Sequence, residues 1–261
     1  MTNPILVTGG TGRLGSVLVD RLLAAGHTVR VLSRGPRPAG PAQPPEHTVG
    51  DLLTAQGLDR ALDGISTVVH CATGNNRTDV DATRHLVAAA SRAGRPHLIY
   101  PSIVGVDRVP LPYYGAKLAC ERLLADSGLP WTVLRATQFH ELIVWMCSAQ
   151  RLLPAVLMPA GVSFQPIGTD DVADRLVSLA GTEPQGRADD MGGPEVRTAT
   201  DLARAWAKAY GRRRPVLAVP VPGAVLRAYR RGDHLTPGHA VGRTTFAQYL
   251  AATRQAPGRR G

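Results

Sequence analysis

Ser102, Tyr113 and Lys117 have the side-chain types and the order that proton delivery to a carbonyl oxygen requires. Tyr113 and Lys117 are four residues apart, so a helix that begins here carries both on one face. The ordinary pKa of a phenol, about 10, is poorly matched to neutral pH, and a nearby ammonium favours the charged phenolate. A serine hydroxyl can polarise the same carbonyl. The three residues predict oxidoreduction at a carbonyl carbon, with Tyr113 as the acid–base.

Lys117 carries extra weight because lysine is rare in this chain. Of the 30 lysines and arginines, only Lys117 and Lys208 are lysines. The alternative, that Tyr113 is a packed residue at the start of a helix, stays open at this stage.

A second pattern, in residues 8–15, joins an apolar run to an amphipathic segment. The sequence there is Thr8-Gly9-Gly10-Thr11-Gly12-Arg13-Leu14-Gly15, which matches both GxGxxG and GxxGxxG. Glycines in this arrangement allow a tight turn and close approach of the backbone to a pyrophosphate, which the following helix N-terminus attracts. We therefore expect a dinucleotide to contact Gly9, Thr11, Gly12, Arg13, Leu14 and Gly15.

The end of the second apolar run indicates which dinucleotide binds. NAD sites usually have an acidic residue there, but this chain has Ser33 and Arg34, with no acidic residue until Glu46. An arginine suits a 2′-phosphate because its planar fork binds phosphate in a bidentate manner. The pattern favours NADP(H), with Arg13 as a further phosphate contact. The alternative, that these arginines are only solvated, stays open.

The elements that must position these residues alternate along the chain. Short apolar runs predict buried strands at Ile5–Thr8, Thr28–Ser33, Thr67–Cys71, His97–Ser102 and Trp131–Ala136. Helical spacing predicts helices at Leu14–Ala25, Leu52–Leu62, Val80–Ala93 and Tyr113–Ser127. The Gly- and Pro-rich residues 34–45 predict a surface loop. The fold class expected is α/β, a Rossmann-like doubly wound parallel sheet with a small α/β C-terminal substrate region.

With the glycine loop, Ser102, Tyr113 and Lys117 in this order, the chain resembles the short-chain dehydrogenase/reductase superfamily. It is most similar to the atypical branch of NmrA-like NAD(P)H-binding proteins, through residues 100–107 (YPSIVGVD), 112–121 (PYYGAKLACE), 134–140 (LRATQFH) and 192–195 (GGPE). The resemblance implies an NADP-binding Rossmann domain over residues 1–150. It also implies a smaller substrate-binding region over 151–261, partly interleaved with the first. Residues 255–261, at the end of the sequence, are expected to be a frayed tail.

The resemblance also implies roles for single residues. Further cofactor contacts are expected from Asp51, Leu52, Ala72 and Thr73, and Lys117 is expected to hold the nicotinamide ribose as well. Ser102 is expected to orient the substrate. One departure is that residues 71–74 (CATG) lack the Asn-Asn-Ala-Gly of single-domain reductases. In this branch the catalytic set is sometimes unused.

Candidate substrate contacts follow the strand Trp131–Ala136 at its carboxyl end. These are Gln138, Phe139, His140 and, on the next helical stretch, Trp145. An apolar substrate would favour such neighbours. A structural imidazole at His140 and a core position for Trp145 are the open alternatives.

The net charge of +10 is concentrated at the C-terminus. Residues 203–261 hold twelve arginines and lysines against Asp233 alone. The run Arg212-Arg213-Arg214 has no interleaved aromatics, so no nucleic-acid partner is expected. The three cysteines show no metal spacing, and no signal peptide or membrane span is recognised. The sequence predicts a cytoplasmic monomer or homodimer without metal that binds a small-molecule substrate.

Together these patterns favour an NADPH-dependent ketoreductase-type enzyme that reduces a ketone or quinone. The substrate would be a small to medium, mostly apolar molecule of specialised metabolism. Two alternatives remain at this stage. One is a non-catalytic NADP(H)-sensing regulator that signals through the basic C-terminal region. The other is a nucleotide-sugar epimerase or dehydratase, which usually has a larger substrate domain.

Overall fold

The computed structural model describes residues 4–35, 45–74 and 76–255. The chain divides into two compact units, and each unit is made of three separate segments of the sequence. The first unit comprises Met1–Ser102, Leu111–Arg135 and Val172–Asp189, and the second comprises Ile103–Pro110, Ala136–Asp171 and Asp190–Gly261.

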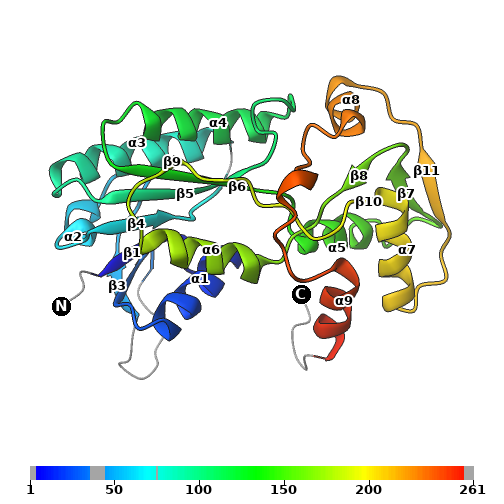
Figure 1. The fold of residues 1–261 in the computed structure, drawn as a ribbon, viewed down its shortest axis with the longest axis horizontal. Coiled ribbons are helices and arrows are strands. Elements are labelled where there is room, and N and C mark those ends of the chain that lie inside the picture. Colours follow the sequence, from blue (N-terminus) through cyan, green and yellow to red (C-terminus); the bar gives the residue numbers. More distant parts are fainter. Residues whose placement is uncertain (1–3, 36–44, 75, 256–261) are drawn as a thin grey trace. The chain divides into compact units, whose positions relative to one another are not determined.

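The first unit is built on a seven-stranded parallel sheet of order β3-β2-β1-β4-β5-β6-β9. Its strands are β1 (Ile5–Thr8), β2 (Val29–Ser33), β3 (Glu46–Val49), β4 (Thr67–His70), β5 (His97–Ile103), β6 (Trp131–Ala136) and β9 (Gly186–Arg187). Its helices are α1 (Arg13–Ala24), α2 (Leu58–Leu62), α3 (Asn76–Arg92), α4 (Pro112–Ala125) and most of α6 (Thr169–Ala180). Helices α3 and α4 cover one face of the sheet, and α1 and α6 cover the other (Figure 1). The Rossmann-like α/β class expected from the sequence is confirmed.

The order of the strands reverses between β1 and β4. These two strands lie side by side, although β2 and β3 come between them in sequence. All four residues of each strand are buried, because helices cover both faces. Thr8 and His70 are register partners at the carboxyl ends of these two strands. In open α/β sheets, ligands bind at this point of reversal.

The second unit contains two small sheets and a separate apolar core. Its elements are α5 (His140–Ser148), β7 (Val156–Pro159), β8 (Ser163–Phe164), β10 (Arg197–Thr198), α7 (Ala199–Ala209), β11 (Val216–Val219), α8 (Ala224–Arg231), a 3₁₀ turn (Pro237–His239) and α9 (Phe246–Gln255). Strands β8 and β10 pair antiparallel, and β7 and β11 pair parallel. The core joins α5 and α7 through buried Ile143, Met158, Phe164 and Trp206.

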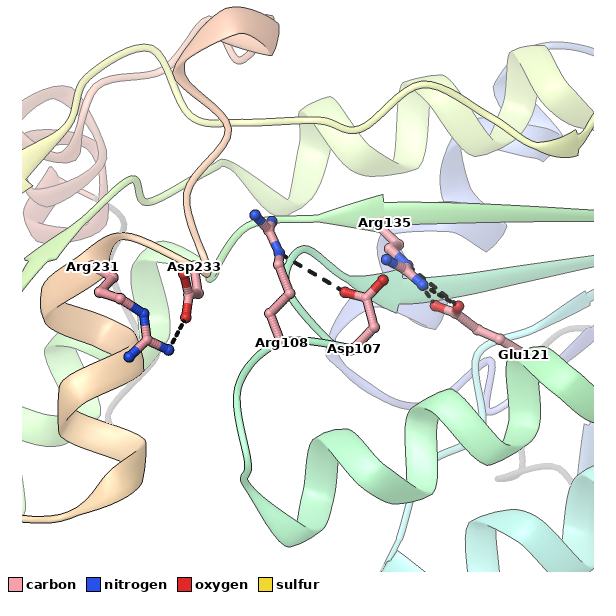
Figure 2. Close-up of polar contacts among 6 residues, drawn as sticks. All are labelled: Asp107, Arg108, Glu121, Arg135, Arg231 and Asp233. Carbon is pink, nitrogen blue, oxygen red and sulfur yellow. Dashed lines mark hydrogen bonds and ion pairs between the residues drawn. The ribbon is translucent and has the colours of Figure 1, made fainter.

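Arginines of the basic C-terminal segment hold parts of the second unit together. Arg214 donates from Nη1 to the carbonyl oxygens of Gln150 (2.6 Å) and Leu153 (2.9 Å). Arg231 Nη2 lies 2.6 Å from Asp233 Oδ2, and Figure 2 shows the two side chains pointing toward one another. Part of the C-terminal charge therefore has a structural role within the unit.

One predicted helix, Leu52–Leu62, is wrong at its start, because α2 begins only at Leu58. Asp51 Oδ1 accepts a hydrogen bond from the Leu53 amide, and Gly57 has the left-handed φ of 74°. Both features hold residues 51–57 in turns that a continuing helix could not contain. Most of the predicted loop at 34–45, and the predicted frayed tail after Gln255, lie outside the described residues.

Candidate dinucleotide and proton-transfer site

The glycine loop connects β1 to α1 in the first unit. Gly12 caps α1 with extended backbone angles and no side-chain hydrogen bond, and the first turn of the helix contains no acidic residue. The amide groups that begin a helix have no partner within it, and the helix dipole makes this end attractive to anions. The loop can therefore receive a pyrophosphate.

Two of the glycines could not be replaced without moving the loop. Gly9 has φ +66°, and a Cβ built on it would lie 2.6 Å from Cα of Ala72. A Cβ on Gly15 would collide with the carbonyl oxygen of Gly9. The glycine requirement inferred from the sequence is thus explained by close backbone approach between the loop, the start of α1 and the segment after β4.

The ends of β2 and β3 carry the other residues expected near a nucleotide. Ser33 is half-buried and donates to the carbonyl oxygen of Gly35 at 2.7 Å, and Arg34 is exposed. Asp51 and Leu52 are half-buried in the turn after β3. His85 of α3 donates from Nδ1 to the carbonyl oxygen of Leu52 at 2.8 Å, which fixes that turn.

The segment after β4 is held by its own hydrogen bonds. The Ala72 amide donates to Thr8 Oγ1 at 3.4 Å. Asp79, near the start of α3, accepts from the Gly74 amide at 2.6 Å and from the Thr73 hydroxyl at 2.9 Å. Ala72 thus lies against Gly9 of the glycine loop, and Thr73 is held beside it by Asp79.

The proton-transfer candidates also lie in the first unit. Ser102, at the end of β5, is 6% exposed, and its Oγ has no hydrogen-bond partner among the described residues. Tyr113 is half-buried in the first turn of α4, which begins at Pro112 as helices often do. Lys117, one turn later, is 6% exposed; its Nζ donates to the carbonyl oxygen of Pro101 at 3.2 Å and lies 4.5 Å from the ring centre of Tyr100. Lys117 is therefore anchored beside the strand that carries Ser102.

Two neighbours of this site, His70 and Tyr100, are not singled out by the sequence patterns. Their rings stack at 5.6 Å between centroids, and they are 2% and 1% exposed. Each residue lies in an apolar run that is typical of a buried strand, so neither stands out as a functional residue. The one signal in the sequence that could have indicated His70 is a histidine at the end of such a buried run.

The candidate substrate contacts belong to the second unit. His140 is fully buried; its Nε2 donates to the Thr244 carbonyl oxygen at 3.0 Å, and its ring stacks on Tyr249 at 4.9 Å. Gln138 is buried, with its Nε2 3.5 Å from the His234 carbonyl oxygen, and Phe139 is half-buried at the cap of α5. Trp145 is 64% exposed on α5, so it does not fill the core.

Buried histidines make the second unit sensitive to acid. Burial lowers the pKa of both His140 and His234 to about 4, below the ordinary value of 6.5. Between pH 6.5 and pH 4 these histidines bind protons in the unfolded chain but stay neutral in the folded chain. The free energy of unfolding therefore falls as the pH drops below 6.5. At pH 5 we expect each histidine to cost about 2 kcal/mol of unfolding free energy relative to pH 7.

Urea unfolding at pH 7 and pH 5 measures this difference. His140→Gln should shrink the loss between the two pH values, whereas His239→Gln, at an exposed position, should leave it unchanged. Equal losses in wild type and His140→Gln would contradict the assignment.

The described residues contain neither a metal-binding cluster nor a helix that could cross a bilayer. No group of histidine, cysteine, aspartate and glutamate side chains within residues 4–35, 45–74 and 76–255 could hold a metal ion. Over the same ranges, no helix combines the length and the apolar character that crossing a bilayer demands.

Comparison with known proteins gives relatives over most of the chain. The chain is 32% identical over 216 residues to the (4-alkanoyl-5-oxo-2,5-dihydrofuran-3-yl)methyl phosphate reductase of Streptomyces griseus, covering 80% of this chain and 74% of that protein. It is 26% identical over 218 residues to quinone oxidoreductase 2 of Escherichia coli, covering 80% and 75%.

Solved structures match the whole fold. The NADPH-dependent quinone oxidoreductase of Escherichia coli, complexed with NADPH, superposes with a TM-score of 0.81 at 22% identity, covering 96% of this chain and 99% of that one. A nucleoside-diphosphate-sugar epimerase of Staphylococcus aureus gives 0.79 at 19% identity, covering 95% and 99%. These likenesses concern the fold.

A family model described as NAD(P)H-binding matches residues 9–180, which contain the glycine loop, Ser102, Tyr113 and Lys117. The NAD(P)H-binding family expected from the sequence is confirmed, and this family is of oxidoreductase type. This chain therefore belongs to the NAD(P)H-binding family.

Proposed function

We propose that this protein is an NADPH-dependent reductase of a ketone or quinone carbonyl in a small to medium, mostly apolar metabolite. Tyr113 is the proton donor. In this proposal the first unit binds the cofactor, and Gln138, Phe139 and Trp145 of the second unit supply substrate contacts. His140, which is fully buried and bonded to the Thr244 carbonyl oxygen, holds the start of α5 in place instead. The names of two relatives, a quinone oxidoreductase and a furanone phosphate reductase, support a redox reaction on a small molecule.

The observation that carries the proposal is the pair of incompletely satisfied polar groups, Ser102 and Lys117. The buried Ser102 hydroxyl has no partner among the described residues, a state that costs about 1–3 kcal/mol. The Lys117 ammonium has three donors, and Pro101 is the one acceptor that the described residues give it. A bound ribose and a substrate carbonyl would supply acceptors for both.

The residues divide the reaction among them. When bound, the nicotinamide supplies a hydride to the carbonyl carbon. Ser102 donates a hydrogen bond to the carbonyl oxygen, and the Tyr113 hydroxyl delivers a proton to that oxygen as it becomes an alcohol. Lys117, one turn along α4, places a positive charge beside the strand that carries Ser102 and holds the ribose. Lys117 is 6% exposed and its Nζ lies 4.5 Å from the ring centre of Tyr100, so little water reaches the ammonium.

Arg34 is expected to select NADPH over NADH. It is exposed at the end of β2, where an acidic residue would select NAD, and it can grip the 2′-phosphate through two parallel hydrogen bonds. Arg34→Ala should weaken NADPH binding by about 10- to 100-fold, because hydrogen bonds between charged groups contribute about 1.5–3 kcal/mol. Titration of the protein with each cofactor, followed by fluorescence, measures the effect.

The matched control for Arg34 is NADH, which lacks the 2′-phosphate and should bind the variant as it binds the wild type. Arg13→Ala, which removes the exposed arginine at the start of α1, tests the second phosphate contact in the same way. An unchanged NADPH preference in Arg34→Ala would overturn the role of Arg34.

The proposed function is tested by mixing the protein with NADPH and a panel of quinones and apolar ketones. Absorbance at the nicotinamide band reports oxidation, and product analysis identifies the alcohol or hydroquinone. Substrate-dependent turnover supports the proposal. NADPH binding without oxidation by any carbonyl compound, together with a protein partner that binds only one redox state of the cofactor, would establish the sensor instead.

A further inference from the structure

Thr8 and His70 meet at the point where the sheet reverses its strand order. They are register partners on β1 and β4, and they are 0% and 2% exposed. Thr8 Oγ1 lies 2.7 Å from His70 Nδ1, and on the other side of the ring His70 Nε2 lies 3.2 Å from Thr83 Oγ1 of α3. The imidazole therefore bridges the strand that leads into the glycine loop and the helix after β4.

The direction of these hydrogen bonds follows from counting protons. Thr83 has one hydroxyl proton, and it donates that proton to the carbonyl oxygen of Asp79 at 2.8 Å. Its oxygen can then only accept from His70, so the imidazole proton is on Nε2. In a neutral ring Nδ1 is therefore an acceptor, and Thr8 donates to it. The oxygen of Thr8 is left to accept the Ala72 amide.

These bonds close a ring around residues 72–74. One side runs from Ala72 through Thr8, His70 and Thr83 to the backbone of Asp79. The other side returns from the Asp79 carboxylate to the Gly74 amide and the Thr73 hydroxyl. The segment that lies against Gly9 is thus held at both ends, and His70 is the residue that joins the two sides.

The surroundings of His70 keep it neutral. Burial and, to a smaller extent, the positive charge of Lys117 lower the pKa of His70 to about 3. Its ring stacks on Tyr100, and Lys117 Nζ lies over the same tyrosine ring. The charged group that acts on the imidazole is Lys117 of α4. The carboxylate of Asp79, one turn before Thr83 on α3, accepts from the Gly74 amide and the Thr73 hydroxyl. A histidine in this place serves to orient other groups rather than to carry a proton at neutral pH.

We propose that His70 is a positioning residue for the dinucleotide: a neutral imidazole, protonated on Nε2, it orients the Thr8 hydroxyl and so fixes the Ala72–Gly74 segment against the glycine loop. The inference rests on the proposed NADPH site. It adds Thr8, His70, Thr83 and Asp79 to the residues that determine cofactor affinity, although His70 itself acts through Thr8 and Ala72.

The first test is the tautomer of His70 in the wild-type protein at neutral pH. Two-bond ¹⁵N–¹H spectra of the imidazole distinguish a proton on Nε2 from one on Nδ1. The signals of His70 are assigned by their loss in His70→Phe or by their shift in Thr8→Val, which keeps the ring but removes its partner. A neutral ring protonated on Nε2 is expected. A ring protonated on Nδ1, or on both nitrogens, would overturn the inference whether or not any variant folds.

The second test compares NADPH affinity among variants that keep either the acceptor near Nδ1 or the donor near Nε2 of the imidazole. His70→Asn keeps an acceptor near Nδ1, and His70→Gln keeps a donor near Nε2. Thr8→Val and His70→Gln should weaken NADPH binding about five- to tenfold, while His70→Asn should stay close to wild type. Melting temperatures are recorded in parallel.

A merely structural histidine predicts a different ranking, in which affinity follows the melting temperature and Asn has no advantage over Gln. That ranking overturns the inference. Wild-type protein that fails to bind NADPH at all would instead contradict the proposed function, so the two failures are distinguishable.

Discussion

Replacing Tyr113 with phenylalanine is expected to lower kcat for carbonyl reduction by about 10²- to 10⁴-fold, the range typical of a lost general acid. The ring stays, so the start of α4 and its edge contact with Tyr114 are retained. Only the hydroxyl that protonates the carbonyl oxygen is removed. NADPH affinity should be unchanged, because the cofactor contacts expected in this unit come from the glycine loop, the ends of β2, β3 and β4, and Lys117. Steady-state turnover and a separate NADPH titration measure the two quantities.

Tyr114→Phe is the matched control, because Tyr114 is the adjacent tyrosine on the same helix and is only 4% exposed. It loses the same atom, and we expect its kcat to stay within about twofold of the wild type, since surface or core hydroxyls away from the chemistry affect stability instead. Equal turnover in Tyr113→Phe and wild type would exclude Tyr113 as the proton donor. Equal loss in both variants would point to a general disturbance of α4.

The parts of the site that could be predicted are those with a local physical requirement. The glycine loop is one, because close backbone approach excludes every side chain, and Gly9 and Gly15 meet this requirement as expected. The strands around it are another. β1 and β6 have the predicted bounds, because a strand buried in a parallel sheet is mostly apolar along its length.

The parts that could not be predicted depend on residues distant in sequence. His70 and Thr8 meet only because β4 pairs with β1, and Lys117 reaches Tyr100 only because α4 packs beside β5. Neither pairing leaves a trace in the spacing of residues. The start of α2 differs from the predicted start at Leu52 for a local reason, because the left-handed Gly57 interrupts the apolar pattern just before Leu58. The spacing of apolar residues indicates which side chains are buried, but it does not reveal the turn that precedes the helix.

The basic C-terminal segment shows how charge can mislead. Taken alone, an excess of arginine is compatible with an anionic partner or with a solvated surface. Two of these arginines instead donate to backbone carbonyl oxygens of their own unit: Arg214 to Gln150 and Leu153, and Arg230 to Ala160. A guanidinium with five donors is suited to bridging such oxygens. Composition alone cannot separate this use from an external one.

Helix α4, which carries Tyr113 and Lys117, is tied to the sheet by a buried ion pair between Glu121 of α4 and Arg135 of β6. Their side chains are 10% and 8% exposed, and two short hydrogen bonds join them, Nε to Oε1 at 2.9 Å and Nη2 to Oε2 at 2.6 Å. Figure 2 shows the guanidinium and the carboxylate facing one another from strand and helix. Glu121→Gln should lower the free energy of unfolding by about 3–5 kcal/mol, because it leaves a buried guanidinium without its counter-charge.

Urea unfolding of the variant measures this loss, and the exposed pair Asp81–Arg84 on α3 gives the comparison. Asp81→Asn should cost at most about 1 kcal/mol, since exposed ion pairs contribute little. The double variant Glu121→Leu/Arg135→Met should recover much of the stability, because both charges leave the interior together. If Glu121→Gln were as mild as Asp81→Asn, the pair would not hold α4. The placement of Tyr113 and Lys117 would then depend on the apolar contacts of that helix, chiefly Cys120 and Leu124 in the core, rather than on a charge.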